Sequence, residues 1–212
     1  MKHYLLVEGV TDVSLVKYIC QTKLNINFSD FEKKKGEAEV DTYKYKDFVI
    51  IDLKGQNNLS HTLTKIIFPE QQRVEKIGII QDADDDFDAS KESIQQAISA
   101  SGISNNKIQY FLTPNNKDTG DLETLLLSTI EKNNKIIDCF DDYKICLENQ
   151  QAVYSKALNK GQIYAYTMYS QTGKNLYKPQ DSFIHKNKDT GLWDLNDKKF
   201  KPIISFVLSI FS

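Results

Sequence analysis

The sequence has 212 residues, of which 40% are hydrophobic and 26% are charged, a composition typical of a globular protein and not of a disordered chain. The formal net charge is −2, which excludes a polycation, so any contact with nucleic acid must use a local basic patch or bound metal ions. The longest apolar run, residues 203–211, is far shorter than the ~20 residues of a membrane-spanning helix, and the N-terminal apolar run is too short for a signal peptide. The three cysteines form no CxxC pair. We therefore expect a cytoplasmic protein without membrane contact.

Strand and helix patterns alternate along the first part of the chain. In chain order they are a buried strand at 3–7, a helix at 11–24, a polar loop or insertion at 25–46, a strand at 48–53, a helix at 58–68, a strand at 76–84, a helix at 89–101, a strand at 107–113 and a helix at 121–130. Thr11 is the expected N-cap of the first helix, and Pro69 and Gly102 are expected to end the second and third. This alternation predicts an α/β fold, with a parallel sheet of about four strands flanked by helices.

The alternation then stops. The remaining patterns are a helix at 136–160, a polar segment with seven aromatic residues at 161–202, and the apolar run at 203–211, which fits a core helix or strand. We therefore expect a catalytic or metal-binding domain at 1–131 and a mainly helical C-terminal extension at 132–212 that packs on it.

Acidic residues follow two of the predicted strands at the point where each strand ends. Glu8 and Gly9 come directly after the first strand, and Asp82 and Asp84 end the third. Asp12 lies one helical turn after Glu8. Because the carboxyl ends of parallel strands form the ligand-binding edge of an open sheet, we expect these carboxylates to share one space. Gly9 lets the backbone turn sharply beside Glu8 without a side chain in the way.

The acids predict a divalent-cation site. The run DADDDFD, residues 82–88, holds five aspartates in seven residues, which is costly unless cations or water neutralise the charge. Asp82 and Asp84 are two residues apart, so in extended backbone they face the same side. Hard oxygen ligands suit Mg²⁺ or Mn²⁺, whose chemistry with nucleic acids is phosphodiester transfer, with Glu8 available to move protons.

The aspartates that follow have a simpler alternative. Taken alone, Asp85, Asp86 and Asp88 are typical of a solvated, capped helix N-terminus, where Asp85 and Asp86 favour the helix dipole. In that interpretation Asp88 or Ser90 caps the helix.

The segment VEGVTD, residues 7–12, followed by a strand that ends in DAD, residues 82–84, resembles a Toprim domain. That module occurs in type IA and type II topoisomerases, bacterial primases, recombination proteins and small nucleases of the OLD and ribonuclease M5 types. The resemblance implies a Toprim-like, Rossmann-like fold over the first domain. It also implies Mg²⁺ held by Asp82 and Asp84, with Glu8 as general acid or base.

Further positions resemble the small members of this family. Asp12 matches the extra acid of the VEGxxD form in OLD-like and M5-like proteins. GDLETLLL, residues 120–127, is similar to a Gly-x-Leu-Glu-x-Leu segment of small stand-alone members, several of them uncharacterised, which implies Glu123 as another acid of the site. The alternative for Glu123 is a helix-surface residue.

KGQNNL, residues 54–59, is similar to a Gly-containing turn after the second strand of the same proteins. Gly9, Gly55 and Asn57 are therefore candidates for backbone contacts with a phosphate group. The alternative for this turn is a plain helix-capping loop.

Two features depart from the family pattern. Gln81 stands where an apolar strand residue is expected, and the chain lacks the large domains of topoisomerases and primases. We therefore expect hydrolysis and not strand passage. The sequence predicts a Mg²⁺-dependent nuclease, or related phosphodiester-transfer enzyme, acting on DNA or RNA. The alternative is a non-catalytic metal- or phosphate-binding module that acts as a subunit or regulator, with a second copy or another protein as partner.

The C-terminal part is basic. Residues 156–201 contain nine lysines and four aspartates, a net charge of +5 that leaves −7 for the rest of the chain. Aromatic residues are interleaved with these lysines, namely Tyr164, Tyr166, Tyr169, Tyr177, Phe183, Trp193 and Phe200. Basic and aromatic residues together can form a platform for single-stranded nucleic acid or RNA. The alternative is that the aromatics form the core of a small subdomain and the lysines keep it soluble.

Overall fold

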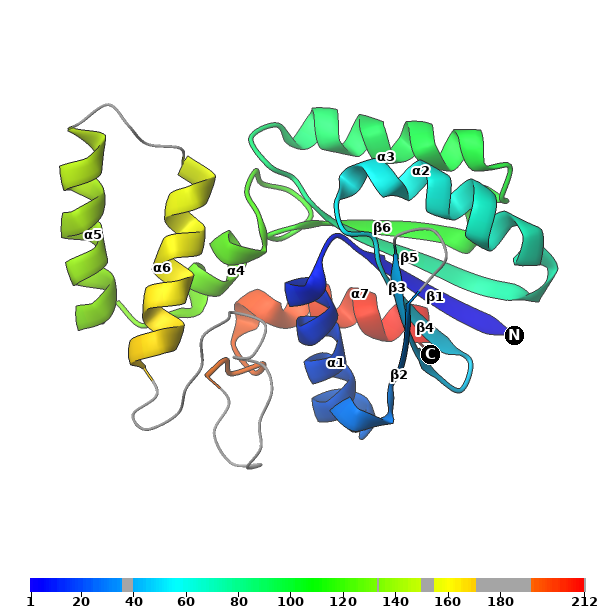
Figure 1. Ribbon diagram of the computed structural model, residues 1–212, viewed down its shortest axis with the longest axis horizontal. Helices are drawn as coiled ribbons and strands as arrows, with labels where there is room; N and C mark the ends of the chain where they lie inside the picture. Colours follow the sequence, from blue (N-terminus) through cyan, green and yellow to red (C-terminus); the bar gives the residue numbers. More distant parts are fainter. Residues whose placement is uncertain (36–39, 133, 150–154, 171–191, 212) are drawn as a thin grey trace.

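The computed structural model describes residues 1–35, 40–132, 134–149, 155–170 and 192–211. In this part of the chain a mixed six-stranded sheet lies between two layers of helices (Figure 1). The strands are β1 (Lys2–Val7), β2 (Glu32–Lys35), β3 (Asp41–Tyr45), β4 (Phe48–Asp52), β5 (Val74–Asp82) and β6 (Ile108–Thr113). Their order across the sheet is β2-β3-β4-β1-β5-β6. The pairs β1–β4, β1–β5 and β5–β6 are parallel, which confirms the predicted α/β class.

The sheet is larger than predicted, because β2 and β3 lie in the segment expected to be a loop. The pairs β2–β3 and β3–β4 are antiparallel. All four residues of β2 are charged and exposed, so this strand carries no apolar pattern that a sequence could reveal. Charged side chains are typical of edge strands, where they discourage pairing with another sheet.

The described helices are α1 (Val10–Leu24), α2 (Leu59–His61), α3 (Phe87–Ser101), α4 (Leu122–Thr129), α5 (Lys135–Glu148), α6 (Ser155–Tyr169) and α7 (Lys201–Phe211). α2 opens a longer helical stretch that continues as a π-helix over Thr62–Ile67 and a 3₁₀ helix over Phe68–Arg73. Pro69 therefore does not end the helical stretch. It occupies the first turn of the 3₁₀ helix, where its missing N–H is tolerated. The single helix expected at 136–160 is two helices, α5 and α6.

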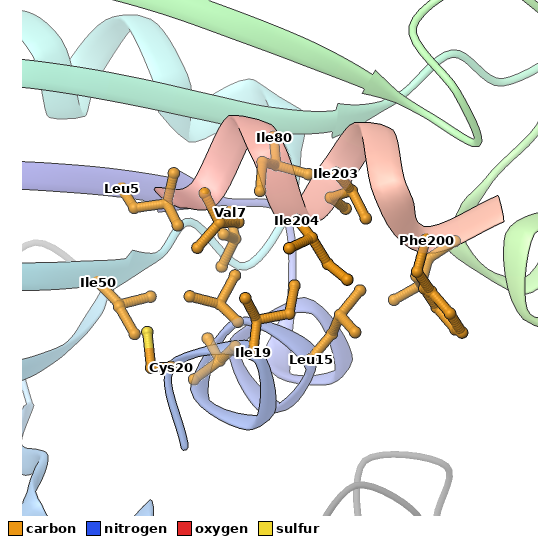
Figure 2. Packing of buried hydrophobic residues seen from close by; sticks show 14 of the residues in the cluster. Leu5, Val7, Leu15, Ile19, Cys20, Ile50, Ile80, Phe200, Ile203 and Ile204 are labelled. Atoms are coloured by element: carbon orange, nitrogen blue, oxygen red, sulfur yellow. The ribbon is translucent and has the colours of Figure 1, made fainter. Parts of the chain in front are cut away.

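Each face of the sheet has its own apolar core. Leu5 and Val7 of β1, with Ile50 of β4, point toward α1 and α7, and Figure 2 shows this packing around Ile19 of α1 and Ile204 of α7. Side chains that alternate with these along β1, β4 and β5 pack on the opposite face with residues of the α2 stretch and α3. The first core joins both ends of the chain and crosses the predicted boundary at residue 131.

The C-terminal aromatics are divided between core and surface. Trp193 and Phe200 are buried at 2% and 0% exposure, and the ring of Tyr166 lies 5.6 Å from that of Trp193. Tyr164 and Tyr169 are exposed. Tyr177 and Phe183 lie outside the described residues. Within the described ranges, no helix is long and apolar enough to cross a membrane.

Candidate functional site

The sheet places β1 at the point where the order of strands reverses. Strand β1 pairs with β4 on one side and with β5 on the other. The helix that follows β1, α1, covers the face that α7 covers, whereas the helix that follows β5, α3, covers the opposite face (Figure 1). A crevice therefore opens between the carboxyl ends of β1 and β5, which is where ligands bind in open α/β sheets.

A cavity of about 270 Å³ lies at this crevice. Its acidic lining is the carboxylate cluster, which we define as Glu8, Asp12, Asp82 and Glu123. Glu8 follows β1, Asp82 is the last residue of β5, and Asp12 and Glu123 lie in the first turns of α1 and α4. The structure thus brings four of the five predicted acids to one cavity, which we call the acidic cavity.

Hydrogen bonds fix the cluster to the ends of the strands. The backbone N–H of Asp82 donates to Oε2 of Glu8 at 3.3 Å, which ties β5 to the residue that follows β1. Oδ1 of Asp82 accepts from the hydroxyl of Thr113 at 2.6 Å and from the backbone N–H of Leu122 at 3.0 Å. Strand β6 and the start of α4 therefore hold Asp82 in place.

Asp12 also shapes the start of α1. Its Oδ2 accepts from the backbone N–H of Gly9 at 3.0 Å, and Gly9 is the N-cap of α1. Thr11 was expected in that position. The helix begins earlier because Asp12 stands three residues after Gly9 and can satisfy its N–H, as the acid of a capping box does.

Three members of the cluster, Asp12, Asp82 and Glu123, hold their protons more tightly than isolated carboxyl groups do. Burial, followed by the charge of Glu8, raises the pKa of Asp82 to about 8. Burial, followed by the charges of Asp82 and Glu8, raises the pKa of Asp12 well above its ordinary value. Burial, followed by Asp121, raises the pKa of Glu123, and Lys160 acts in the opposite direction. Like charges in a confined space oppose full ionisation unless a cation balances them.

Asp84 is placed differently from the other predicted acids. β5 ends at Asp82, and Asp84 has a left-handed backbone with φ of 54°, so the extended backbone assumed for the two aspartates does not continue through Asp84. Oδ2 of Asp84 accepts from the side-chain amide of Gln56 at 2.8 Å. Its backbone exchanges two hydrogen bonds of 2.8 Å with Gly120. Among the described residues, the lining of the acidic cavity does not include Asp84.

The predicted phosphate-binding turn has its N–H groups already engaged. Gly9 and Gly55 line the acidic cavity, but Gly9 N–H donates to Asp12, and Gly55 N–H donates to the carbonyl of Glu8 at 3.0 Å. Asn57 lines a separate cavity of about 380 Å³ that residues of the α2 stretch and α3 form. Gly55 therefore supports the backbone of Glu8, and the N–H groups of Gly9 and Gly55 already have partners within the protein.

The aspartates after Asp84 include a helix cap. Oδ1 of Asp86 accepts from the backbone N–H of Ala89 at 3.0 Å, which makes Asp86 the N-cap of α3. The expected caps, Asp88 and Ser90, were wrong. α3 begins at Phe87, ahead of both the predicted start and Asp88, and the hydroxyl of Ser90 donates to the carbonyl of Ala83 at 2.9 Å.

Sequence reasoning missed several residues of the site. Thr113 ends β6 beside Asp82, so extending the strand-end argument to the fourth predicted strand could have found it. Lys54 and Lys160 line the acidic cavity; Lys54 begins the KGQNNL segment and Lys160 lies in the basic region 156–201, but neither was named as a site residue. Lys160 lies in α6, and its position depends on packing between α6 and α4 that the sequence pattern does not encode.

The chemistry of the cluster fits a hard divalent cation. Its donors are all carboxylate oxygens, which Mg²⁺ and Mn²⁺ prefer, and burial, followed by the neighbouring carboxylates, raises the pKa values of Asp82 and Asp12 in the absence of a cation. As the side chains stand, no group of three Asp, Glu, His or Cys residues within the described ranges is arranged to hold a metal ion. Binding would therefore draw the carboxylates of the cluster toward one another.

Comparison with known proteins gives a family without an assigned activity. Residues 2–212 match the model of a family described as "Protein of unknown function (DUF3226)". No curated protein and no solved structure matches the chain.

Proposed function

The chain belongs to the DUF3226 family, and we propose that it is a Toprim-like, Mg²⁺-dependent nuclease that hydrolyses phosphodiester bonds of nucleic acid. The observation that carries this proposal is the meeting of Glu8, Asp12, Asp82 and Glu123 at one cavity at the carboxyl ends of β1 and β5. These are positions that the Toprim resemblance assigns to acid–base and metal-binding roles.

The chain's own residues would divide the work as follows. Mg²⁺ or Mn²⁺ would be held by Asp82, Asp12 and Glu123. When bound, the ion supplies positive charge that activates an attacking water and stabilises the leaving oxygen. Glu8 would transfer a proton, because it lines the same cavity and accepts the backbone N–H of Asp82, which keeps its carboxylate at the junction of the two strands. Thr113 would orient Asp82 through its hydroxyl.

A second function is favoured by one observation. Acidic and basic side chains line the same cavity, which would also suit a non-catalytic metal- or phosphate-binding module that regulates, or is a subunit of, another protein. In that case the cavity would bind a ligand without hydrolysing it.

A cleavage assay tests the proposed function. The purified chain is incubated with labelled single- and double-stranded DNA and RNA in Mg²⁺, Mn²⁺ or chelator, and the variants Glu8→Gln and Asp82→Ala are assayed beside it. We expect metal-dependent cleavage that Asp82→Ala abolishes through loss of a metal ligand and that Glu8→Gln reduces at least ~100-fold, the usual order for loss of an acid–base group.

Asp88→Asn is the matched control, because Asp88 is an exposed aspartate of α3 close in sequence to Asp82 and it should leave cleavage unchanged. Binding without cleavage by the unmodified chain, under every metal condition, would favour the non-catalytic module.

A further inference from the structure

The acidic cavity also has cationic side chains on its walls. Lys54, from the turn after β4, and Lys160, from α6, line it together with the carboxylate cluster. A cavity of carboxylates alone repels polyanions, and these lysines add positive charge that attracts a phosphate. The question is whether the fold holds them there or leaves them as ordinary surface lysines.

Lys54 is held by both its backbone and its side chain. Its φ is 53°, a left-handed conformation uncommon for a residue with a side chain, and its N–H donates to Oδ1 of Asp52 at 3.0 Å. The next N–H, that of Gly55, donates to the carbonyl of Glu8 at 3.0 Å. The turn that carries Lys54 is thereby fastened to both β4 and the residue that follows β1.

A buried acid on β3 positions the ammonium group of Lys54. Asp41, whose side chain is only 10% exposed, lies 3.5 Å from Nζ of Lys54 and 2.9 Å from Nζ of Lys33. Lys33, ahead of the other causes, keeps the pKa of Asp41 below its ordinary value, so Asp41 is charged at neutral pH. The carboxylate of Asp41 is shared with Lys33, so it orients Lys54 without being a partner of that lysine alone.

Lys160 is held by the packing of α6 on α4. The neighbouring residue, Asn159, donates its side-chain amide to Oγ1 of Thr124 at 3.3 Å, and Thr124 follows Glu123 directly. Lys160 and Glu123 both line the acidic cavity, where α4 and α6 pack on each other.

We propose that Lys54 and Lys160 form a phosphate-binding pair that holds the backbone of a nucleic-acid strand across the carboxylate cluster, an inference that rests on the proposed function. Each lysine presents a compact charge that contacts phosphate oxygens without selecting a base. The pair therefore sets where the strand lies and not which sequence is bound.

The test is the salt dependence of binding. Affinities of the full chain for fluorescein-labelled single-stranded DNA, RNA and duplex DNA are measured by fluorescence anisotropy across a range of salt, with Ca²⁺ in place of Mg²⁺ so that binding is observed and not cleavage. We expect Lys54→Met and Lys160→Met each to weaken binding severalfold. Each should also reduce the slope of log affinity against log salt by about 0.7–0.9, the contribution of one phosphate contact.

Two further variants make the result specific. Lys54→Arg keeps the charge and should keep the slope, whereas a structural defect would not depend on charge. Lys65→Met removes an exposed lysine of the π-helix and should change neither affinity nor slope. If the wild type binds and both methionine variants keep the wild-type slope, the proposed phosphate-binding role of Lys54 and Lys160 is wrong, and the proposed function is unaffected. A wild-type chain that neither binds nor cleaves any of these nucleic acids would remove both.

Discussion

Asp82 is the residue at which the sheet and the acidic cavity meet. It ends β5, its N–H donates to Glu8, and its Oδ1 accepts from Thr113 and from the N–H of Leu122. A carboxylate held by such bonds cannot turn away from its acidic neighbours. The raised pKa of Asp82, caused first by burial and then by Glu8, is the consequence of that fixed position.

We expect Asp82→Asn to stabilise the metal-free protein, and we expect the increase in its free energy of unfolding to grow with pH. The unfolded carboxyl group loses its proton near pH 4, whereas in the folded chain it keeps the proton up to a pKa of about 8. Between these values unfolding releases a proton, so the folded wild type loses stability as pH rises. Asparagine keeps an acceptor oxygen for Thr113 and Leu122 and removes the charge.

Urea unfolding in chelator at pH 5 and pH 8 measures this effect. The free energy of unfolding of Asp82→Asn should exceed that of the wild type by about 1–3 kcal/mol at pH 8 and by clearly less at pH 5. Asp88→Asn, on the exposed surface of α3, should show no such trend. A gain that is equal at the two pH values would contradict the assigned environment of Asp82.

At the scale of residues, the sequence was informative where a side chain follows directly from a strand or opens a helix. Glu8 and Asp12 are of this kind and reach the acidic cavity, as does Glu123, which only the family resemblance suggested. The left-handed backbone of Asp84 was not predictable, because it accompanies paired hydrogen bonds with Gly120, which lies 36 residues further along the chain. Lys54 went unrecognised because Asp41, which positions it, lies on a strand that the sequence did not reveal.

At the scale of elements, α7 is placed by its close approach to the centre of the sheet. A Cβ atom on Gly78 of β5 would lie 2.6 Å from Cδ1 of Leu5 and 2.7 Å from Cγ1 of Ile210. Both neighbours are fully buried. Gly78 therefore allows α7 to lie directly over β1 and β5, and this helix completes the core under the acidic cavity.

We expect Gly78→Ala to lower the free energy of unfolding by about 1–3 kcal/mol, because the added methyl group overpacks a filled core. The double variant Gly78→Ala with Ile210→Ala should recover part of that loss relative to the sum of the single variants, since truncating Ile210 makes room for the methyl group. Denaturant unfolding of the four proteins gives the coupling free energy. Strict additivity would show that Gly78 and α7 are not in contact.

The four parallel strands and most helices were predictable because their apolar patterns are strong. β2 was not, since it has four exposed charged residues and is stabilised only by pairing with β3. The π-helix at Thr62–Ile67 was not predictable either, because it departs from the period of an α-helix over only one turn. Local patterns thus gave the parallel core, and tertiary pairing decided the rest.

At the scale of the whole molecule, the order of strands explains why the acidic cavity exists. β1 lies between β4 and β5, and the helices that follow β1 and β5 cover opposite faces (Figure 1). The carboxyl ends of these strands are therefore not closed by a connecting helix. α4 and α6 bring Glu123 and Lys160 to the same opening, so the C-terminal part of the chain contributes to the site as well as to the core.

The central claim is that the carboxylate cluster binds a divalent cation, and Mn²⁺ titration followed by electron paramagnetic resonance tests it most directly. We expect saturable Mn²⁺ binding by the wild type that Mg²⁺ displaces. The Asp82→Ala and Glu123→Gln variants should lose it, while Asp88→Asn should retain it. Saturable binding that survives in both Asp82→Ala and Glu123→Gln, or no saturable binding by the wild type, would contradict the claim.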